Sequence, residues 1–226
     1  MQGKTRYALV ACLMFLSVTV LGTQQEMLMK EEAARVAQIK SLMREPPVPM
    51  PEKIDSPAAW AYRRVTLAGH FLYDHEFLMK PRILGGVSGY HMLVPFQRAS
   101  GGIVMVNRGW ISDAEMPKAD RPGGTIMIEG IVQAPHALPS MPPNDPQKNI
   151  WRWADVNAMA AAGKLEAPSP VIVVVSGRTP GVYPAGGMVE INIRSDYGAR
   201  AVFWYVLALI LLAGFFVRHL RKSPSA

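Results

Sequence analysis

The sequence has almost no cysteine, and it has no acidic residue near either end. Its single cysteine, Cys12, lies in an uncharged N-terminal run, so the long region between the two chain ends has no thiol. Disulfide bonds, thiol redox chemistry and cysteine-based metal transfer are therefore excluded for that region. We expect no metal site there.

Acidic residues are confined to the middle of the chain, and this distribution accounts for the net charge of +7. All 17 acidic residues and 18 of the 24 basic residues lie between positions 24 and 198, so that span is close to neutral. A nucleic-acid-binding protein needs a basic stripe on its folded surface, and we therefore expect no nucleic-acid partner. The other six basic residues flank the chain ends: Lys4, Arg6, Arg200, Arg218, Arg221 and Lys222.

Two long runs contain no charged residue, at positions 7–23 and 201–217. A helix of this length rises about 26 Å, which is adequate for the hydrocarbon core of a bilayer. Basic residues stand on the terminal side of both runs, so the positive-inside rule predicts two transmembrane helices with both termini in the cytoplasm. The region between them would then be exported, which in a bacterium means that it is periplasmic and anchored twice in the inner (cell) membrane.

Each run has an alternative interpretation. The first could be the apolar part of a cleaved signal peptide, but Leu21-Gly22-Thr23-Gln24 is not a convincing cleavage site, which favours a retained anchor. The second could be a buried core helix, but aromatic residues at 203–205 and basic residues at the other end favour a membrane span. The predicted organisation is a tail at 1–6, a span at 7–23, a helical extension at 24–45, an exported β-rich domain at 46–196, a second span at 199–217 and a basic tail at 218–226.

The segment after the first run is typical of a helix. Residues 24–45 contain no Gly or Pro and are rich in good helix formers. Val36, Ile39 and Met43 form a narrow apolar stripe at helical spacing. We expect the first helix to continue out of the bilayer and to stop at Pro46-Pro47, before an extended linker.

The residue pattern of the exported region predicts a series of short strands. β-Branched or aromatic runs bounded by Gly, Pro, Asp or Ser predict a mainly antiparallel meander, with a short helix at 156–163 that Asp155 caps and Gly163 ends. The fold class we expect is therefore a membrane protein whose two transmembrane helices bracket a small β-barrel or two-layer sheet with one or two short helices. The predicted strands are 64–72, 76–82, 88–97, 101–110, 124–135, 170–178 and 187–194.

One of these strands ends in an unusual series of side chains, Asn107-Arg108-Gly109-Trp110. Asn107 and Arg108 are able to satisfy backbone carbonyls or to pair with an acid, and Gly109 permits a bend or a close backbone approach. Trp110 is suited either to cap the core or to lie at a membrane interface. Chemistry alone favours a structural role, because a solitary Arg and Trp do not define a reaction.

VNRGW is followed by Ile111, Arg121 and a Gly-rich strand that ends in Glu-Gly. This series resembles the surfeit locus protein 1 family, whose members are membrane assembly factors for haem-copper oxidases, and further motifs extend the resemblance. The stretch 89–96, with Gly89 and Pro95, is similar to the family's Gly-x-x-x-x-Thr-Pro-Phe, and 142–160, with Asn149, Trp151 and Asp155, to its proline–asparagine–tryptophan–aspartate segment. Residues 62–65 with Gly69 match its first strand. The resemblance implies that VNRGW is a signature of the fold, which orients the strand end toward the membrane or a partner, and no catalytic residues are implied.

The sequence departs from the family at two places that concern haem. After the first span, Gln24 replaces a Trp and Leu28 stands in the position of an Arg. Before the second span, Arg194 replaces the histidine of Asn-Asn-His-x-x-Tyr, while Tyr197 is retained. The family would use that histidine as a haem ligand, and Arg has no lone pair to donate. Arg194 and Arg200 are instead suited to a haem propionate or lipid phosphate, and Tyr197 to iron ligation or interfacial anchoring.

The resemblance implies an assembly factor and not an enzyme. It would bind the oxidase core subunit and other assembly factors in the membrane lipid, and help to insert haem or to stabilise that subunit. A quinol oxidase without haem carriage is an alternative client. Periplasmic copper delivery is a further alternative because of the 14 methionines, which are however scattered. A secreted hydrolase is disfavoured because His70, His75, His91 and His136 lack a nucleophile elbow or zinc motif.

Overall fold

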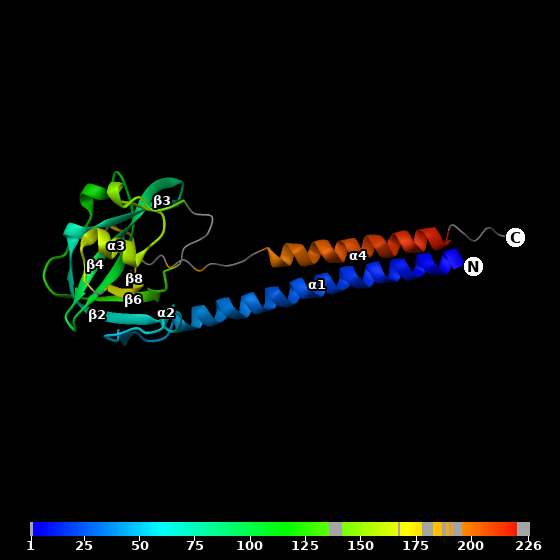
Figure 1. Cartoon of the computed structure of the whole chain (residues 1–226), viewed down its shortest axis with the longest axis horizontal. Coiled ribbons are helices and arrows are strands. Elements are labelled where there is room, and N and C mark those ends of the chain that lie inside the picture. The colour runs from blue at the N-terminus through cyan, green and yellow to red at the C-terminus, as the bar shows by residue number, and fades with distance from the viewer. Residues whose placement is uncertain are drawn as a thin grey trace. The chain divides into compact units, whose positions relative to one another are not determined.

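The computed structural model describes residues 2–135, 142–166, 168–177, 183–186, 189, 191 and 196–220 (Figure 1). The chain forms two compact units. One contains Met1–Gln38 and Ile191–Ala226, and the other contains Ile39–Glu190. The first unit is helical and the second is built mainly of strands.

The helical unit contains two long helices, α1 (Gln2–Leu42) and α4 (Tyr197–Leu220). Both are long enough to cross a membrane, and each contains an apolar stretch of 18 residues, with a mean hydropathy of 1.7 for the stretch within Arg6–Leu42 and 2.2 for the stretch within Tyr197–Arg218. The predicted continuation of the first helix is confirmed, because α1 is one helix of 41 residues that ends shortly before Pro46-Pro47. A proline disfavours helical conformation in the residue before it, which explains this end.

The strands of the second unit close into a five-stranded barrel. Its strands are β2 (Arg64–Phe71), β6 (Ile126–Gln133), β8 (Pro168–Val175), β5 (Ile103–Ser112) and β4 (Val87–Arg98), and β4 pairs with β2 to close the ring. Only the β5–β8 pair is parallel within the ring. Of the two architectures that the sequence left open, the small, mainly antiparallel barrel is therefore confirmed.

Short elements complete the barrel. β1 (Val48–Pro49) runs parallel to β2, so the predicted extended linker begins as an edge strand. β3 (Phe77–Leu84) pairs with β4, and β7 (Ile150–Trp151) runs parallel to β3. The remaining helical elements are α2 (Pro57–Trp60), α3 (Val156–Gly163) and the 3₁₀ turns η1 (Tyr73–His75), η2 (Met116–Lys118) and η3 (Pro146–Lys148).

The predicted meander is wrong for its first turn. A simple meander would pair β2 with β3, but β2 pairs with β4 at Gly69–Phe71 and β3 pairs with β4 from Phe77 onward. The two strands therefore lie end to end along the same edge of β4, and η1 is a step between them. The amide of Leu72 donates to the carbonyl of Pro95 at 2.9 Å, which continues the ladder into this step.

Strand β5 is the centre of the core, as its apolar run predicts. Val104, Met105 and Val106 have no exposed surface. Val104 and Val106 pack in the barrel interior with Val65 and Phe96, whereas Met105 faces the second cluster. This alternation follows from the period of two in a strand. The second cluster lies beneath α3 and contains Phe77, Leu93, Trp151, Met159 and Ile172.

The predicted helix at 156–163 is confirmed with its cap. The carboxylate of Asp155 accepts a hydrogen bond from the amide of Ala158 at 3.0 Å, and the helix ends at Lys164, which is left-handed with a φ of 50°. Most of the predicted strand 187–194, together with His136, lies outside the described residues.

Candidate functional site

The VNRGW segment forms a β-bulge in the β4–β5 ladder. Leu93 pairs with Asn107 and Met92 pairs with Gly109, so Arg108 is the extra residue on β5. Gly109 has a φ of +122°, and a Cβ atom at this position would lie 2.1 Å from the carbonyl oxygen of Ala185. Only glycine fits both the backbone conformation and this close approach. The predicted close backbone approach is therefore confirmed.

The side chains on either side of the bulge are buried and hydrogen-bonded. The amide oxygen of Asn107 accepts from the amide of Gly109 at 2.9 Å, and its nitrogen lies 3.1 Å from Nδ1 of His91. The indole nitrogen of Trp110 donates to the carbonyl of Arg82 at 3.2 Å. Trp110 is 7% exposed, so it caps the core, which was one of the two roles that the sequence allowed.

The bulge directs Arg108 onto two aromatic rings. Its guanidinium carbon lies 5.0 Å from the ring centroid of Phe71 and 5.4 Å from that of Tyr73. The guanidinium also donates to the backbone carbonyl of Asp120. Burial lowers the pKa of Arg108 and raises the pKa of Tyr73, because both charged forms lose hydration here. Stacking and the carbonyl contact offset part of that loss.

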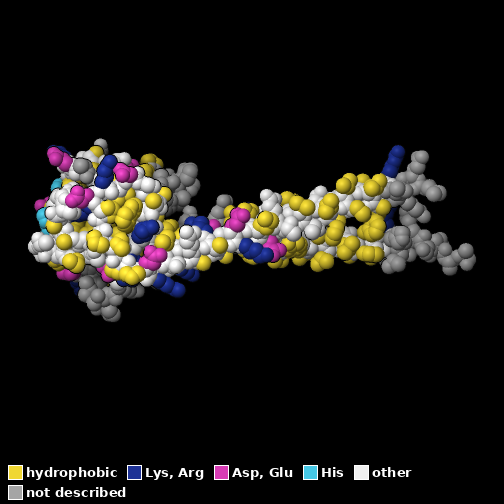
Figure 2. Space-filling model, turned by 90° about the horizontal axis from the view of Figure 1, so that it is seen from below, with side chains coloured by type: hydrophobic (Ala, Val, Ile, Leu, Met, Phe, Trp, Pro, Cys, Tyr) yellow, Lys and Arg dark blue, Asp and Glu magenta, His cyan; other side chains and the backbone are white. Residues whose placement is uncertain are grey.

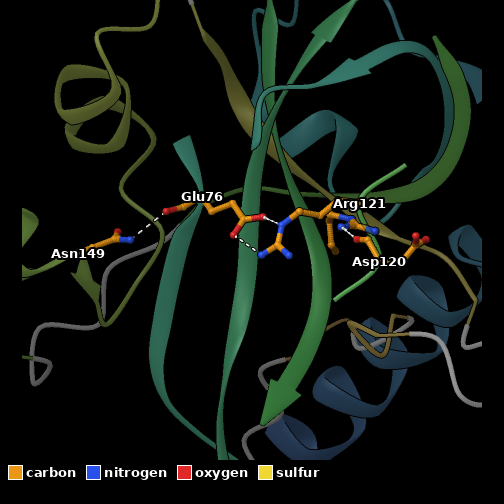
Figure 3. A network of polar contacts seen from close by, with 5 residues as sticks. Glu76, Asp120, Arg121 and Asn149 are labelled. Atoms are coloured by element: carbon orange, nitrogen blue, oxygen red, sulfur yellow. Dashed lines mark hydrogen bonds and ion pairs between the residues drawn. The ribbon is translucent and has the colours of Figure 1, made fainter. Parts of the chain in front are cut away.

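A second polar network ties three distant segments together around Glu76 (Figure 3). Arg121 approaches the Glu76 carboxylate with two nitrogens, at 2.7 and 2.9 Å. The amide nitrogen of Asn149 donates to the Glu76 carbonyl at 2.9 Å, and its oxygen accepts from the indole of Trp151 at 2.7 Å. The hydrogen bond with Glu76 raises the pKa of Arg121. Asn149 thus satisfies the only polar atom of a fully buried Trp151 side chain.

The remaining signature residues also have structural roles. A Cβ atom at Gly89 would lie 2.8 Å from the Trp110 ring, so this glycine makes room for the indole. Pro95 pairs with Met105 in the β4–β5 ladder, and Asp155 caps α3. The motifs that distinguish this sequence therefore hold the barrel together. Among the described residues, no group of three or more His, Cys, Asp or Glu side chains is placed to hold a metal ion.

The second candidate site is the face that α1 and α4 turn toward each other. A Cβ atom at Gly22 would lie 2.8 Å from the ring of Tyr205, so the missing side chain makes room for that ring. The Tyr205 hydroxyl donates to the Glu26 carboxylate at 3.0 Å, and Lys30 pairs with Glu26 at 2.7 Å. Further along, the sulfur of Met29 lies 3.3 Å from the Cβ position of Gly198. The helices are therefore antiparallel partners joined by side chains.

Burial along both helices follows a spacing of three and four residues, which is typical of paired helices. Gly22 and Ala208 are buried in the pair and Ala11 is half-buried, so these small residues allow the helices to approach closely. The small residues Ser17, Ala213 and Gly214 are exposed on other faces. The more buried positions include Ala8, Ala11, Phe15, Val18, Gly22 and Gln25 on α1, and Tyr197, Ala201, Trp204, Ala208, Leu211 and Phe215 on α4.

The structure describes two of the three residues that the sequence suggested as a cofactor site. Tyr197 is the first residue of α4 and is half-buried. Arg200 follows on the first turn and forms an ion pair with Asp196. Arg194 lies outside the described residues. Two described cations of the helix pair, Lys30 and Arg200, thus each have a carboxylate partner four residues away.

Sequence reasoning missed the contact between Glu26 and Tyr205. These residues are 179 positions apart, so local patterns do not connect them. One signal was available, since Glu26 is the first acidic residue after the apolar run and Tyr205 belongs to the aromatic group near the start of the second run. An acid and a phenol at the same level of two adjacent spans are suited to a hydrogen bond.

Comparisons with known proteins agree with these features. The model of the SURF1 family matches residues 12–209. A SURF1-like protein of Monosiga brevicollis is 29% identical over 209 residues, covering 85% of this chain and 80% of its own. Surfeit locus protein 1 of Rattus norvegicus is 26% identical over 94% of this chain and 76% of its own, and that of Homo sapiens is 27% identical over 90% and 74%.

Proposed function

Because the chain belongs to the SURF1 family, we propose that it is an assembly factor for a haem-copper terminal oxidase of respiration. It would act by contact with the oxidase core subunit and other assembly factors in the membrane, and not as an enzyme. The observation that carries this proposal is the family match across the barrel and into both apolar helices, since residues 12–209 contain the barrel, most of α1 and the first half of α4.

The paired helices are the working surface that we propose for this contact. Both present large apolar side chains away from their partner, including Leu13 and Leu16 on α1 and Leu209 and Ile210 on α4, each at least 60% exposed. Figure 2 shows hydrophobic side chains (yellow) along both helices, and such side chains suit lipid or the transmembrane helices of a client. The contact of Gly22 and Glu26 with Tyr205 would fix which faces remain outward.

Haem enters this proposal as cargo of the client and not as a resident cofactor. The histidine that the family would use is Arg194 here, and Arg200 is engaged by Asp196. Tyr197 is the candidate iron ligand that remains among the described residues, and a phenolate alone does not make a haem site that also engages the propionates. These residues do not fit a bound haem. We therefore propose that the chain stabilises the core subunit while haem is inserted.

We further propose that both termini are cytoplasmic and that residues 46–196 are periplasmic in a bacterial inner membrane. The distribution of basic residues supports this orientation, because the two chain ends contain Lys and Arg without any acid. Reporter fusions after Lys53 and after Lys222 should report opposite sides of the membrane. A cytoplasmic report after Lys53 would contradict the orientation.

Deletion of the gene tests the function and identifies the client. Membranes of the deletion strain should lose oxidase activity, measured separately with cytochrome c and with a quinol as electron donor. Loss of the first activity indicates a cytochrome c oxidase client, and loss of the second indicates a quinol oxidase. Retention of both activities at wild-type levels would refute an assembly role. Copper delivery is a lesser alternative, supported only by scattered methionines, and stoichiometric Cu(I) on the purified protein would favour it.

A further inference from the structure

The terminal ends of α1 and α4 meet in a stack of one cation and two aromatic rings. The guanidinium carbon of Arg218 lies 4.5 Å from the ring centroid of Tyr7. On the same helix as Arg218, the Phe215 ring is nearly parallel to Tyr7, with 6.3 Å between centroids and 9° between planes. A guanidinium that stacks by its face keeps its N–H groups in its own plane. The stack therefore places the Arg218 guanidinium against the Tyr7 ring, at the terminal end of the helix pair.

The two ends of the helix pair differ in charge. At the outward end Lys30 is paired with Glu26 and Arg200 is paired with Asp196, so cations and anions alternate. At the terminal end no such partner exists in the sequence, because residues 1–25 and 197–226 contain no Asp or Glu. Five basic residues occur there: Lys4, Arg6, Arg218, Arg221 and Lys222. No acidic side chain of these two segments neutralises this end, so it is suited to bind an anion from outside the chain.

We propose that the terminal end of the helix pair, organised by Tyr7, Arg218 and Arg6, is a binding site for the headgroup of an anionic phospholipid. The inference rests on the membrane insertion proposed above. A planar guanidinium is suited to bind a phosphate by two hydrogen bonds, and a second arginine on the neighbouring helix adds charge. Basic clusters at the end of transmembrane helices attract anionic lipids in this way.

The surroundings of the stack favour a lipid over a free phosphate ion. The next turns of both helices expose large apolar side chains, with Leu9 60% and Val10 55% exposed on α1, and Phe216 53% and Val217 51% exposed on α4. Acyl chains of a lipid whose phosphate contacts Arg218 would cover these side chains. A soluble phosphate has no group that does so. A zwitterionic lipid offers the same acyl chains, but its ammonium group would face the arginines.

The test compares lipids bound to the full-length chain. The protein is reconstituted in nanodiscs with equal amounts of phosphatidylglycerol and phosphatidylcholine, and the lipids that stay bound are counted by native mass spectrometry. The variants are Arg6→Gln with Arg218→Gln, and Tyr7→Leu, which keeps both charges but removes the ring. The control is Lys118→Gln with Lys148→Gln, which removes two charges from the surface of the barrel domain.

We expect the wild-type chain and the control to retain phosphatidylglycerol in preference to phosphatidylcholine. In the double arginine variant this preference should fall about five-fold or more for each charge removed. Tyr7→Leu should lose part of it, and an excess of inorganic phosphate should not displace the lipid. Equal retention of both lipids by the wild-type chain would overturn the proposal, as would equal losses in the variant and the control. A chain that does not enter nanodiscs at all would instead refute the membrane insertion.

Discussion

The hydroxyl of Tyr205 donates a 3.0 Å hydrogen bond to Glu26, and its ring occupies the space that the missing side chain of Gly22 leaves open. The direction of this contact follows from helix geometry. Side chains point toward the N-terminus of their own helix, and α4 runs antiparallel to α1. Tyr205 therefore reaches back along α4 to the level at which the first acidic residue of α1 occurs. One glycine, one phenol and one carboxylate align the two apolar helices.

Filling the space at Gly22 should weaken this pair. In Gly22→Leu the new side chain would collide with the Tyr205 ring, and overpacking of this kind costs about 1–3 kcal/mol. We expect lower thermal stability in detergent and reduced oxidase activity of membranes. The matched control is Ser17→Leu, because Ser17 is exposed on the same helix. Wild-type behaviour of Gly22→Leu would show that the pair does not depend on this position.

The bulge in VNRGW predicts an unequal response of two glycines. Gly109→Ala combines a φ of +122° with a contact of 2.1 Å to a backbone oxygen, and such strain should cost roughly 3 kcal/mol or more. Gly123→Ala is the control, because no atom lies within 4 Å of its Cβ position. Thermal unfolding followed by circular dichroism measures both. Similar melting temperatures for the two variants would contradict the role assigned to Gly109.

Glu115 should make the barrel domain sensitive to acid. Hydrogen bonds from Tyr183 and then from Ser112 lower the pKa of Glu115 from its usual value of 4.5. A carboxylate with a lowered pKa in the folded state stabilises the fold above pH 4.5, and this contribution is lost as the pH falls through the folded-state pKa. The wild-type chain should thus melt higher than Glu115→Gln at pH 7, and the difference should shrink below pH 4.5. A difference that stays constant from pH 7 to pH 3 would contradict this assignment.

Three residues near position 197 in the sequence give a prediction that separates function from folding. If Arg194, Tyr197 and Arg200 form a polar collar where the second span enters the bilayer, Arg194→Ala and Tyr197→Phe should reduce oxidase maturation without changing the abundance of the protein. Immunoblots and oxidase activity of the same membranes measure both quantities. A fall in abundance equal to the fall in oxidase activity would show that the residues are structural. Full oxidase activity in both variants would contradict the collar hypothesis.

Local patterns predicted the elements of this fold well. The apolar run of β5, the cap at Asp155 and the length of α1 each depend on neighbouring residues, and the structure confirms all three. The pairing of β2 was predicted wrongly because a turn of three residues is typical of a hairpin. Here that turn is a 3₁₀ helix that moves the chain along the edge of β4, a step that depends on the partner strand and not on the turn itself.

The polar contacts were less predictable because they join distant parts of the chain. Asn107 and Arg108 were singled out, but their partners His91, Phe71 and Tyr73 come from other strands or turns. Asn149 contacts Glu76 across 73 positions, and no local pattern connects them. Residue types thus indicated where polar side chains would be needed, while the topology of the barrel determined which groups satisfy them.

The oxidase haem spectrum of a deletion strain tests the central claim most directly. Reduced-minus-oxidised spectra are recorded for membranes of the deletion strain, for the same strain with the wild-type gene restored, and for the strain with Gly22→Leu. We predict that the haem bands of the terminal oxidase are diminished in the deletion strain, restored by the wild-type gene and restored only in part by the variant. Haem bands of normal height in the deletion strain would contradict the account.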